Sequence, residues 1–283
     1  MRIARDALVV VFMALQATIL WSQTPTPGPQ TTSFNQQWLG IVVSIEVGDP
    51  QKDIRPIGTG FLVRTANDHV VLVTAKHVIQ APLPSGSRLA YRLNTIEGGS
   101  AVVWDSDLAE TLGAWFLSPS ADLACRFIAW PEAAKLVTLT PDNFIADGAL
   151  SAGAPVFVLG FPLGLRSAEQ PRPIARHGIV GRVDRDNVIA DAFVFPGNSG
   201  GPVIYSPSLK VGPGLKSPLL NEEKLVGVVS SFIRYRETAV SQQTQRPRVV
   251  FEENSGLSNV VPVAKLVELL SSEPVESLDG SIK

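Results

Sequence analysis

The sequence contains very little cysteine and little charge. One cysteine, Cys125, occurs in 283 residues, so an intramolecular disulfide is excluded and the core must be stable without one. Cys125 lies in an apolar stretch, where we expect a buried and inert thiol. Only 18% of the residues are charged and the formal net charge is -2, so no basic field is available and we expect no nucleic-acid partner. The three histidines have no ligand-like spacing, and we expect neither a metal nor a cofactor.

The apolar run at the start of the chain is shorter than a membrane-spanning helix. It covers residues 7–21, is interrupted by Gln16 and Thr18, and follows Arg2 and Arg5. A spanning helix needs roughly 20 apolar residues. The pattern resembles a secretory signal peptide over residues 1–22, followed by a Pro/Thr-rich linker over 23–37. We therefore expect a secreted or periplasmic protein; a membrane contact would require residues 7–21 to remain as an uncleaved anchor.

The rest of the chain alternates short β-rich runs with Gly, Pro, Asn and Asp, which is typical of an all-β barrel or sandwich. Residues 131–154 lack such runs and are interpreted as a connector between two halves, 38–130 and 155–271. Apolar residues at helical spacing after Pro262 predict a short C-terminal helix that closes the second half. Residues 272–283 are expected to form a flexible tail.

The most specific feature is the glycine-rich turn Phe-Pro-Gly-Asn-Ser-Gly-Gly-Pro at residues 195–202. Glycines allow the backbone to direct its N–H groups toward one point. Ser199 in such a turn can attack a carbonyl group while the N–H groups of Gly197 and Ser199 receive the developing oxyanion. Taken alone, the turn is also compatible with an ordinary glycine-rich hairpin.

A nucleophilic serine needs a base and a carboxylate that orients the base. The candidates for the base are the histidines of the sequence: His69, His77 and His177. His77 follows the buried-strand pattern of residues 70–74 and begins a short helical turn, which is a rigid place for a base. For the carboxylate, Asp122 lies just before a predicted strand, whereas Asp105 and Asp107 lie in a polar turn.

Three segments resemble the active-site motifs of trypsin-like serine peptidases, especially the bacterial HtrA/Deg branch: Thr-Ala-Lys-His-Val at 74–78, Ala-Asp-Leu-Ala at 121–124 and Gly-Asn-Ser-Gly-Gly-Pro at 197–202. The resemblance covers roughly residues 38–270. It implies two six-stranded antiparallel β-barrels and a serine endopeptidase acting on protein or peptide substrates. It makes His77 the general base and acid, Asp122 its orienting group and Ser199 the nucleophile, with the Gly197 and Ser199 N–H groups as the oxyanion hole.

The resemblance also implies where the substrate pocket lies. The residues of its walls would be Phe193, Val194, Phe195, Ser230, Ser231 and Phe232. Ser230 would lie next to the substrate backbone. Because these walls contain no carboxylate and Asp191 is expected outside the pocket, we expect cleavage after small or medium aliphatic residues and not after Lys or Arg. Phe232 is expected to narrow the pocket, unless it turns outward.

Some features depart from the family pattern. Lys76 replaces a small residue and is expected to point to solvent. No PDZ domain is expected after the barrel. Two polar insertions, 206–223 and 235–254, are expected to gate the cleft. The turn also fits the nucleophile elbow of α/β-hydrolases, but that fold needs a histidine after Ser199, and none follows His177. The alternative function is a catalytically suppressed trypsin-like barrel that serves as a protein-binding scaffold.

Overall fold

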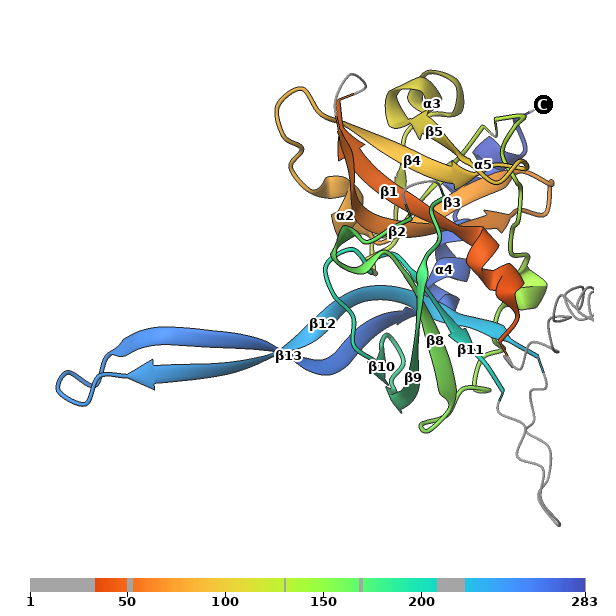
Figure 1. Cartoon of the computed structure of the whole chain (residues 1–283). Helices are drawn as coiled ribbons and strands as arrows, with labels where there is room; N and C mark the ends of the chain where they lie inside the picture. The colour runs from red at the N-terminus through yellow and green to blue at the C-terminus, as the bar shows by residue number, and fades with distance from the viewer. Residues whose placement is uncertain (1–33, 50–52, 130, 168–169, 208–221, 283) are drawn as a thin grey trace, which may run out of the picture. The chain divides into compact units, whose positions relative to one another are not determined.

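The structure describes residues 34–49, 53–129, 131–167, 170–207 and 222–282, and its framework is two antiparallel sheets (Figure 1). In this computed structural model the first sheet has the strand order β5-β4-β1-β2-β3-β7-β6, and the second is a closed barrel with the order β10-β13-β12-β11-β8-β9. The predicted all-β class is confirmed. The first sheet contains seven strands, not six, because the two-residue strand β6 pairs with β7.

The first sheet and its connections occupy residues 36–127. Its strands are β1 (Val42–Gly48), β2 (Ile54–Arg64), β3 (Val70–Thr74), β4 (Arg88–Asn94), β5 (Ser100–Trp104), β6 (Phe116–Leu117) and β7 (Ala124–Phe127). The 3-10 helix η1 (Gln36–Ile41) precedes them, and α2 (Lys76–Gln80) and α3 (Asp105–Leu112) connect them. Strand β3 is buried at every residue because its alternate side chains enter different cores: Val71 and Val73 join one apolar cluster, and Val70 and Leu72 the other.

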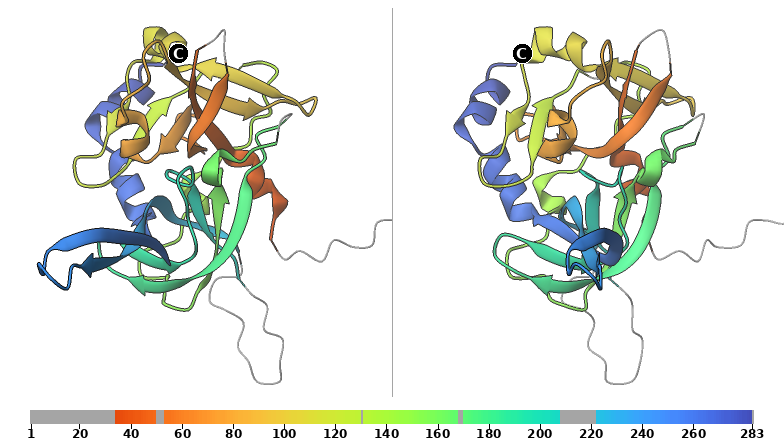
Figure 2. Two further views of the ribbon diagram at one scale, coloured as in Figure 1. Left: turned by 60° about the vertical axis from the view of Figure 1, so that its left-hand side comes forward. Right: turned by 90° about the vertical axis from the view of Figure 1, so that its left-hand side faces the viewer.

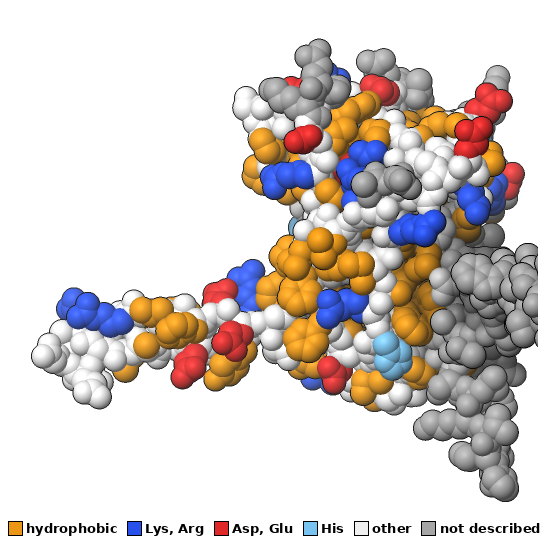
Figure 3. Space-filling model, viewed as in Figure 1, with side chains coloured by type: hydrophobic (Ala, Val, Ile, Leu, Met, Phe, Trp, Pro, Cys, Tyr) orange, Lys and Arg blue, Asp and Glu red, His pale blue; other side chains and the backbone are white. Residues whose placement is uncertain are grey.

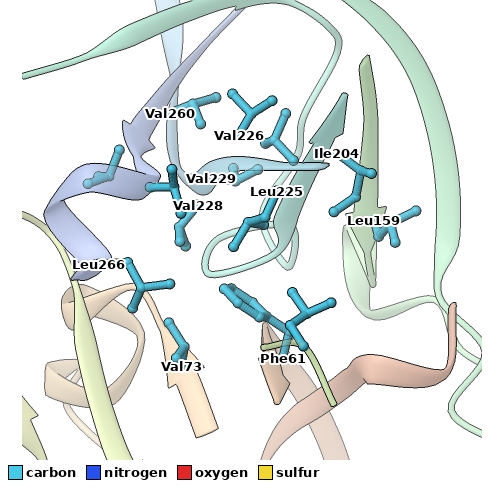
Figure 4. Packing of buried hydrophobic residues seen from close by; sticks show 14 of the residues in the cluster. Phe61, Val73, Leu159, Ile204, Leu225, Val226, Val228, Val229, Val260 and Leu266 are labelled. Atoms are coloured by element: carbon cyan, nitrogen blue, oxygen red, sulfur yellow. The ribbon is translucent and has the colours of Figure 1, made fainter. Parts of the chain in front are cut away.

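The barrel follows a connector that contains the 3-10 helix η2 (Pro141–Asn143). Its strands are β8 (Pro155–Gly160), β9 (Ile174–Val183), β10 (Val188–Asp191), β11 (Pro202–Tyr205), β12 (Lys224–Val240) and β13 (Pro247–Pro262), with η3 (Pro162–Gly164) after β8. The larger apolar cluster joins both sheets, because Phe61 and Val73 of the first sheet pack with Leu225 and Val228 of the barrel (Figure 4). The two halves therefore share this larger core.

The C-terminal segment is ordered along its described length. Helix α4 (Val263–Leu270) begins after Pro262 as predicted and buries Val263, Leu266 and Leu269. Residues 272–283 were expected to be a flexible tail, but they contain helix α5 (Glu273–Asp279). The physical reason is that Val275 is buried and the Asp279 carboxylate accepts hydrogen bonds from the turn between β2 and β3.

The predicted insertion 235–254 is a continuation of β12 and β13. Beyond the barrel the two strands pair from Arg234–Asn254 to Val240–Pro247 and form a two-stranded ribbon, residues 233–254, that projects from the barrel (Figures 1 and 2). Most of the other insertion, residues 208–221, lies outside the described residues, as do the predicted signal peptide and most of the linker in residues 1–33. Within the residues that are described, no helix is long and apolar enough to cross a bilayer.

Candidate active site

Strand pairing in the first sheet brings His77 and Asp122 together. Strand β3 ends at Thr74, and His77 lies in the first turn of α2, which follows at once. Strand β7 pairs antiparallel with β3, so that Thr74 lies opposite Ala124. Asp122 precedes Ala124 by two residues, and the antiparallel pairing therefore places it beside the segment that leaves β3. The site depends on this register, because a shift of one residue would reverse the direction of each side chain.

The Asp122 carboxylate accepts hydrogen bonds from both the ring and the backbone of His77. Oδ2 lies 2.7 Å from His77 Nδ1, and Oδ1 accepts the backbone N–H of His77 at 3.0 Å. The Ser230 hydroxyl donates a third bond to Oδ2 at 2.6 Å. Partial burial raises the pKa of Asp122, but the hydrogen bonds from His77 and Ser230 outweigh it and hold the pKa at about 2. An ionised Asp122 keeps the proton of neutral His77 on Nδ1 and leaves Nε2 as the basic nitrogen.

The turn that carries Ser199 requires glycine at two positions. Gly197 and Gly200 have positive φ angles of 100° and 84°. A Cβ atom on Gly197 would lie 2.2 Å from the Phe161 carbonyl oxygen, and one on Gly200 would lie 2.1 Å from that of Thr59. Only glycine fits these positions. The turn presents Ser199 at the cleft, where its hydroxyl donates to the Ser230 carbonyl at 3.2 Å.

Two backbone N–H groups beside the Ser199 hydroxyl are free. The N–H groups of Asn198, Gly200 and Gly201 donate to backbone carbonyls. Among the residues that the structure describes, those of Gly197 and Ser199 donate to none. Free amide donors next to a serine hydroxyl can stabilise the negative oxygen that forms when the hydroxyl attacks a carbonyl group.

Thr59 of β2 holds the turn from the other sheet, and the sequence analysis missed it. Its hydroxyl donates to the Gly197 carbonyl at 2.6 Å and accepts the N–H of Phe161 at 3.1 Å. Its own N–H donates to the Ser199 carbonyl at 2.9 Å. Thr59 is completely buried. The available signal was a hydroxyl side chain inside an apolar strand, since a buried polar group requires partners.

Two hollows meet at Ser199. The first, of about 400 Å³, is lined by His77, Asp122 and Ser199 together with Val194, Phe195, Pro196, Val229, Ser230, Ser231, Phe232 and Arg234. The second, of about 340 Å³, is lined by residues that include Arg55, Ile57, Leu83, His77, Gly197 and Ser199. Of the predicted pocket residues, Phe193 alone is not in the first hollow, because its ring stacks on Phe195 and is half exposed. Arg234 was not predicted.

The alternative candidates have other partners. His69 Nδ1 lies 2.8 Å from the Asp279 carboxylate, and the His177 ring packs edge-on against Phe157. Asp105 accepts hydrogen bonds from Tyr91, Trp115 and Arg126. Asp107 lies in α3. None of these four candidates lines either hollow at Ser199.

Two further expectations concern single side chains. The Lys76 ammonium donates to the Ser118 carbonyl at 2.8 Å and is therefore held against the protein, not directed freely to solvent. Cys125 is buried as expected, and burial raises the pKa of its thiol to about 12, so the thiolate is scarce at neutral pH.

Among the described residues no group of three or more His, Cys, Asp or Glu side chains is placed to hold a metal ion.

Comparison with known proteins identifies the family. Among solved structures, human heparin binding protein resembles the chain with a TM-score of 0.48 and 12% identity, over 87% of this chain and 93% of that one. A search of curated proteins finds no match. The family model of the trypsin-like peptidase domain matches residues 58–207, which are more than half of the 283 residues and include His77, Asp122 and Ser199. The chain therefore belongs to the family of trypsin-like peptidase domains.

Proposed function

We propose that the protein is a serine endopeptidase that hydrolyses peptide bonds of protein substrates through an acyl-enzyme on Ser199. The observation that carries the proposal is the His77–Asp122 pair at 2.7 Å, which lines the same hollow as Ser199. The two free N–H groups of Gly197 and Ser199 add the second requirement, a place for the oxyanion.

Each residue then has one role in the reaction. His77 Nε2 takes the proton of the Ser199 hydroxyl while Oγ attacks the substrate carbonyl, and Asp122 stabilises the imidazolium that forms. His77 next gives this proton to the leaving amine, and water hydrolyses the acyl-enzyme by the same route. The Ser199 hydroxyl must first leave the Ser230 carbonyl and turn toward His77; such tightening on substrate binding is common in peptidase sites.

The two hollows favour cleavage within a chain over cleavage at its end. His77, Pro196 and Ser199 line both hollows. A peptide bond held at Ser199 would therefore have room for substrate residues on its N-terminal side in the first hollow and on its C-terminal side in the second. This arrangement is the reason for proposing an endopeptidase.

The first hollow favours an aliphatic residue before the cleaved bond. Val194, Val229 and Phe232 give it apolar walls, and Phe232 packs against the core instead of turning outward. Among the described residues that line it, Asp122 alone carries a carboxylate, and it is already bonded to His77 and Ser230. A buried Lys or Arg head group would lack a partner, at a cost of several kcal/mol, and we expect such peptides to be poor substrates.

The proposal extends to the HtrA/Deg-like branch and to a secreted or periplasmic location. Its support is the sequence of residues 1–22, together with the three motifs. N-terminal sequencing of the protein from its native host tests the location. We expect a start within about residues 18–30; a soluble cytoplasmic protein that retains Met1 would contradict it, and a membrane-bound one would indicate the anchor over 7–21.

One observation favours a second candidate, the catalytically suppressed scaffold. The Ser199 hydroxyl is bonded to the Ser230 carbonyl at 3.2 Å, which is an unreactive orientation. A fluorophosphonate probe separates the two functions, because it labels only a serine activated by its base. Labelling of Ser199 supports the peptidase, and failure to label a folded protein supports the scaffold.

The direct test of the peptidase is Ser199→Ala. We expect casein cleavage to fall by about 10⁴-fold or more with the fold intact, because the hydroxyl supplies the covalent step and little packing. Ser120→Ala, an exposed serine outside both hollows, is the matched control and should cleave normally. Undiminished cleavage by the Ser199→Ala protein would refute the assignment.

A further inference from the structure

The ribbon begins at the substrate hollow. Strand β12 runs from Ser230 and Phe232, which line the first hollow, directly into the ribbon, and Arg234 lines the same hollow. The Arg234 guanidinium lies 5.7 Å from the centre of the Phe232 ring. Its side chain is 54% exposed, so its donors are accessible to a ligand in the cleft.

The mouth of this hollow has excess positive charge. The Glu252 carboxylate is shared by two guanidinium groups, Arg234 at 3.2 Å and Arg236 at 2.7 Å. The Arg176 guanidinium lies 5.2 Å from the centre of the ring of Phe195, a residue that lines the hollow. Two cations thus share one carboxylate at the base of the ribbon, which leaves one positive charge there in excess.

The other acidic residues of the ribbon do not neutralise the positive charge of Arg234 and Arg236. Arg234 pairs with Asn254 and Arg236 with Glu252, whereas Tyr235 pairs with Glu253 and Glu237 with Phe251. Since successive side chains of a strand point to opposite faces, Glu237 and Glu253 lie on the face away from Arg234. In the space-filling view, basic, acidic and hydrophobic groups are all exposed along the projecting ribbon (Figure 3).

The base of the ribbon is fixed to the wall of the hollow. Asn254, the cross-strand partner of Arg234, donates from Nδ2 to the Val194 carbonyl at 2.7 Å and accepts the Gly256 N–H on Oδ1 at 2.9 Å. Val194 itself lines the hollow. Arg234 is therefore held at a defined place relative to the substrate site, although the ribbon extends into solvent.

An extended substrate would bring a particular side chain to Arg234. Alternate side chains of an extended peptide point the same way and are roughly 6.8 Å apart. If the residue before the cleaved bond enters the hollow, the residue two positions earlier points to the same side, above Phe232 and its stacked guanidinium. We propose, on the basis of the peptidase function above, that Arg234 selects substrates with Asp or Glu at the third residue before the cleaved bond.

Matched peptides test this selection. Three peptides that differ only at the third residue before the bond, with Glu, Gln or Lys there, are compared by kcat/KM. For the native protein we expect Glu to exceed Gln by about two- to fivefold, with Lys lowest, since a charge-assisted contact at a half-exposed site is of this size. The preference should weaken as salt is added. Arg234→Gln should remove it, and Arg234→Glu should reverse it in favour of Lys.

Arg248→Gln is the control for net charge. This substitution makes the same change of charge on the same ribbon. Arg248 lies beyond the Ala239–Val249 pair, however, which is itself roughly 17 Å along the strand from Arg234. It should keep the full preference for Glu. Equal preferences in the native and Arg234→Gln proteins, or equal losses in Arg234→Gln and Arg248→Gln, would overturn the inference.

A binding measurement separates this inference from the peptidase function. The Ser199→Ala protein is titrated with the three fluorescently labelled peptides, and its double variant with Arg234→Gln serves as the comparison. Tighter binding of the Glu peptide that depends on Arg234 supports the inference even if no hydrolysis occurs. Equal binding of all three peptides contradicts it, whatever the outcome for the peptidase.

Discussion

Thr59→Val is a nearly isosteric change at the point where the first sheet holds the nucleophile turn. Valine has the shape of threonine but replaces its hydroxyl by a methyl group. The change removes the bond from Thr59 Oγ1 to the Gly197 carbonyl at 2.6 Å and the bond from the Phe161 N–H to Oγ1 at 3.1 Å. The backbone bond from Thr59 to Ser199 is kept.

The expected loss of stability follows from two backbone groups left without partners. The Gly197 carbonyl and the Phe161 N–H lie in buried residues, and water cannot easily replace the hydroxyl. Each unpaired buried group costs about 1–3 kcal/mol, so the free energy of unfolding should fall by about 2–6 kcal/mol. If the loss of this bond also shifts the backbone at Gly197, the Gly197 N–H, one of the two oxyanion donors, is misplaced and kcat should fall by about 10²- to 10³-fold.

Thr59→Ser is the matched control, because it keeps the hydroxyl and removes only a methyl group, at about 1 kcal/mol. Urea unfolding gives the two stabilities, and burst titration with a fluorophosphonate gives the fraction of reactive Ser199. We expect the serine variant to remain close to the native protein and the valine variant to lose both stability and reactivity. The reasoning is refuted if valine costs no more than serine.

Two further predictions concern carboxylates. The pKa of Asp122 is lowered from 3.8 to about 2 in the folded protein. Its ionised form therefore stabilises the fold at pH above about 4, and this contribution is lost as pH falls toward 2. In urea unfolding, the stability difference between the native and Asp122→Asn proteins should be constant above pH 5 and shrink below pH 4. Asp279→Ala leaves Thr65, Asn67 and His69 without their shared acceptor. The free energy of unfolding should fall by about 2–5 kcal/mol, measured by thermal unfolding, while labelling of Ser199 stays unchanged. An unaltered melting temperature would contradict the role of Asp279 in holding α5.

The sequence predicts those parts of the fold in which local chemistry and burial agree. The continuous β-branched run at 70–74 forms β3, buried on both faces, and Pro262 precedes α4 where the apolar spacing becomes helical. The glycines of the nucleophile turn are needed because positive φ angles and close carbonyl contacts exclude a side chain. These features depend on neighbours in the sequence, so a pattern can reveal them.

Contacts between distant segments were not visible in the same way. Residues 272–283 are polar and resemble a frayed end, but Asp279 finds three donors more than 200 residues away. The segment 235–254 has the composition of a loop, yet β12 and β13 continue their pairing through it. In both cases a partner strand or turn supplies the stabilisation that local propensity lacks, so composition alone gave the wrong local structure.

The ribbon illustrates how such an insertion can change recognition without disturbing the chemistry. It enters after Phe232, beyond Ser230, the residue of β12 that contacts both Asp122 and Ser199. Arg234, near its start, nevertheless lines the hollow, and Asn254 fastens the return strand to the pocket wall at Val194. A short two-stranded ribbon is only marginally stable alone. Here its base is fixed by the barrel, and side chains near that base, Arg234 above all, are therefore the ones whose positions can affect substrate selection.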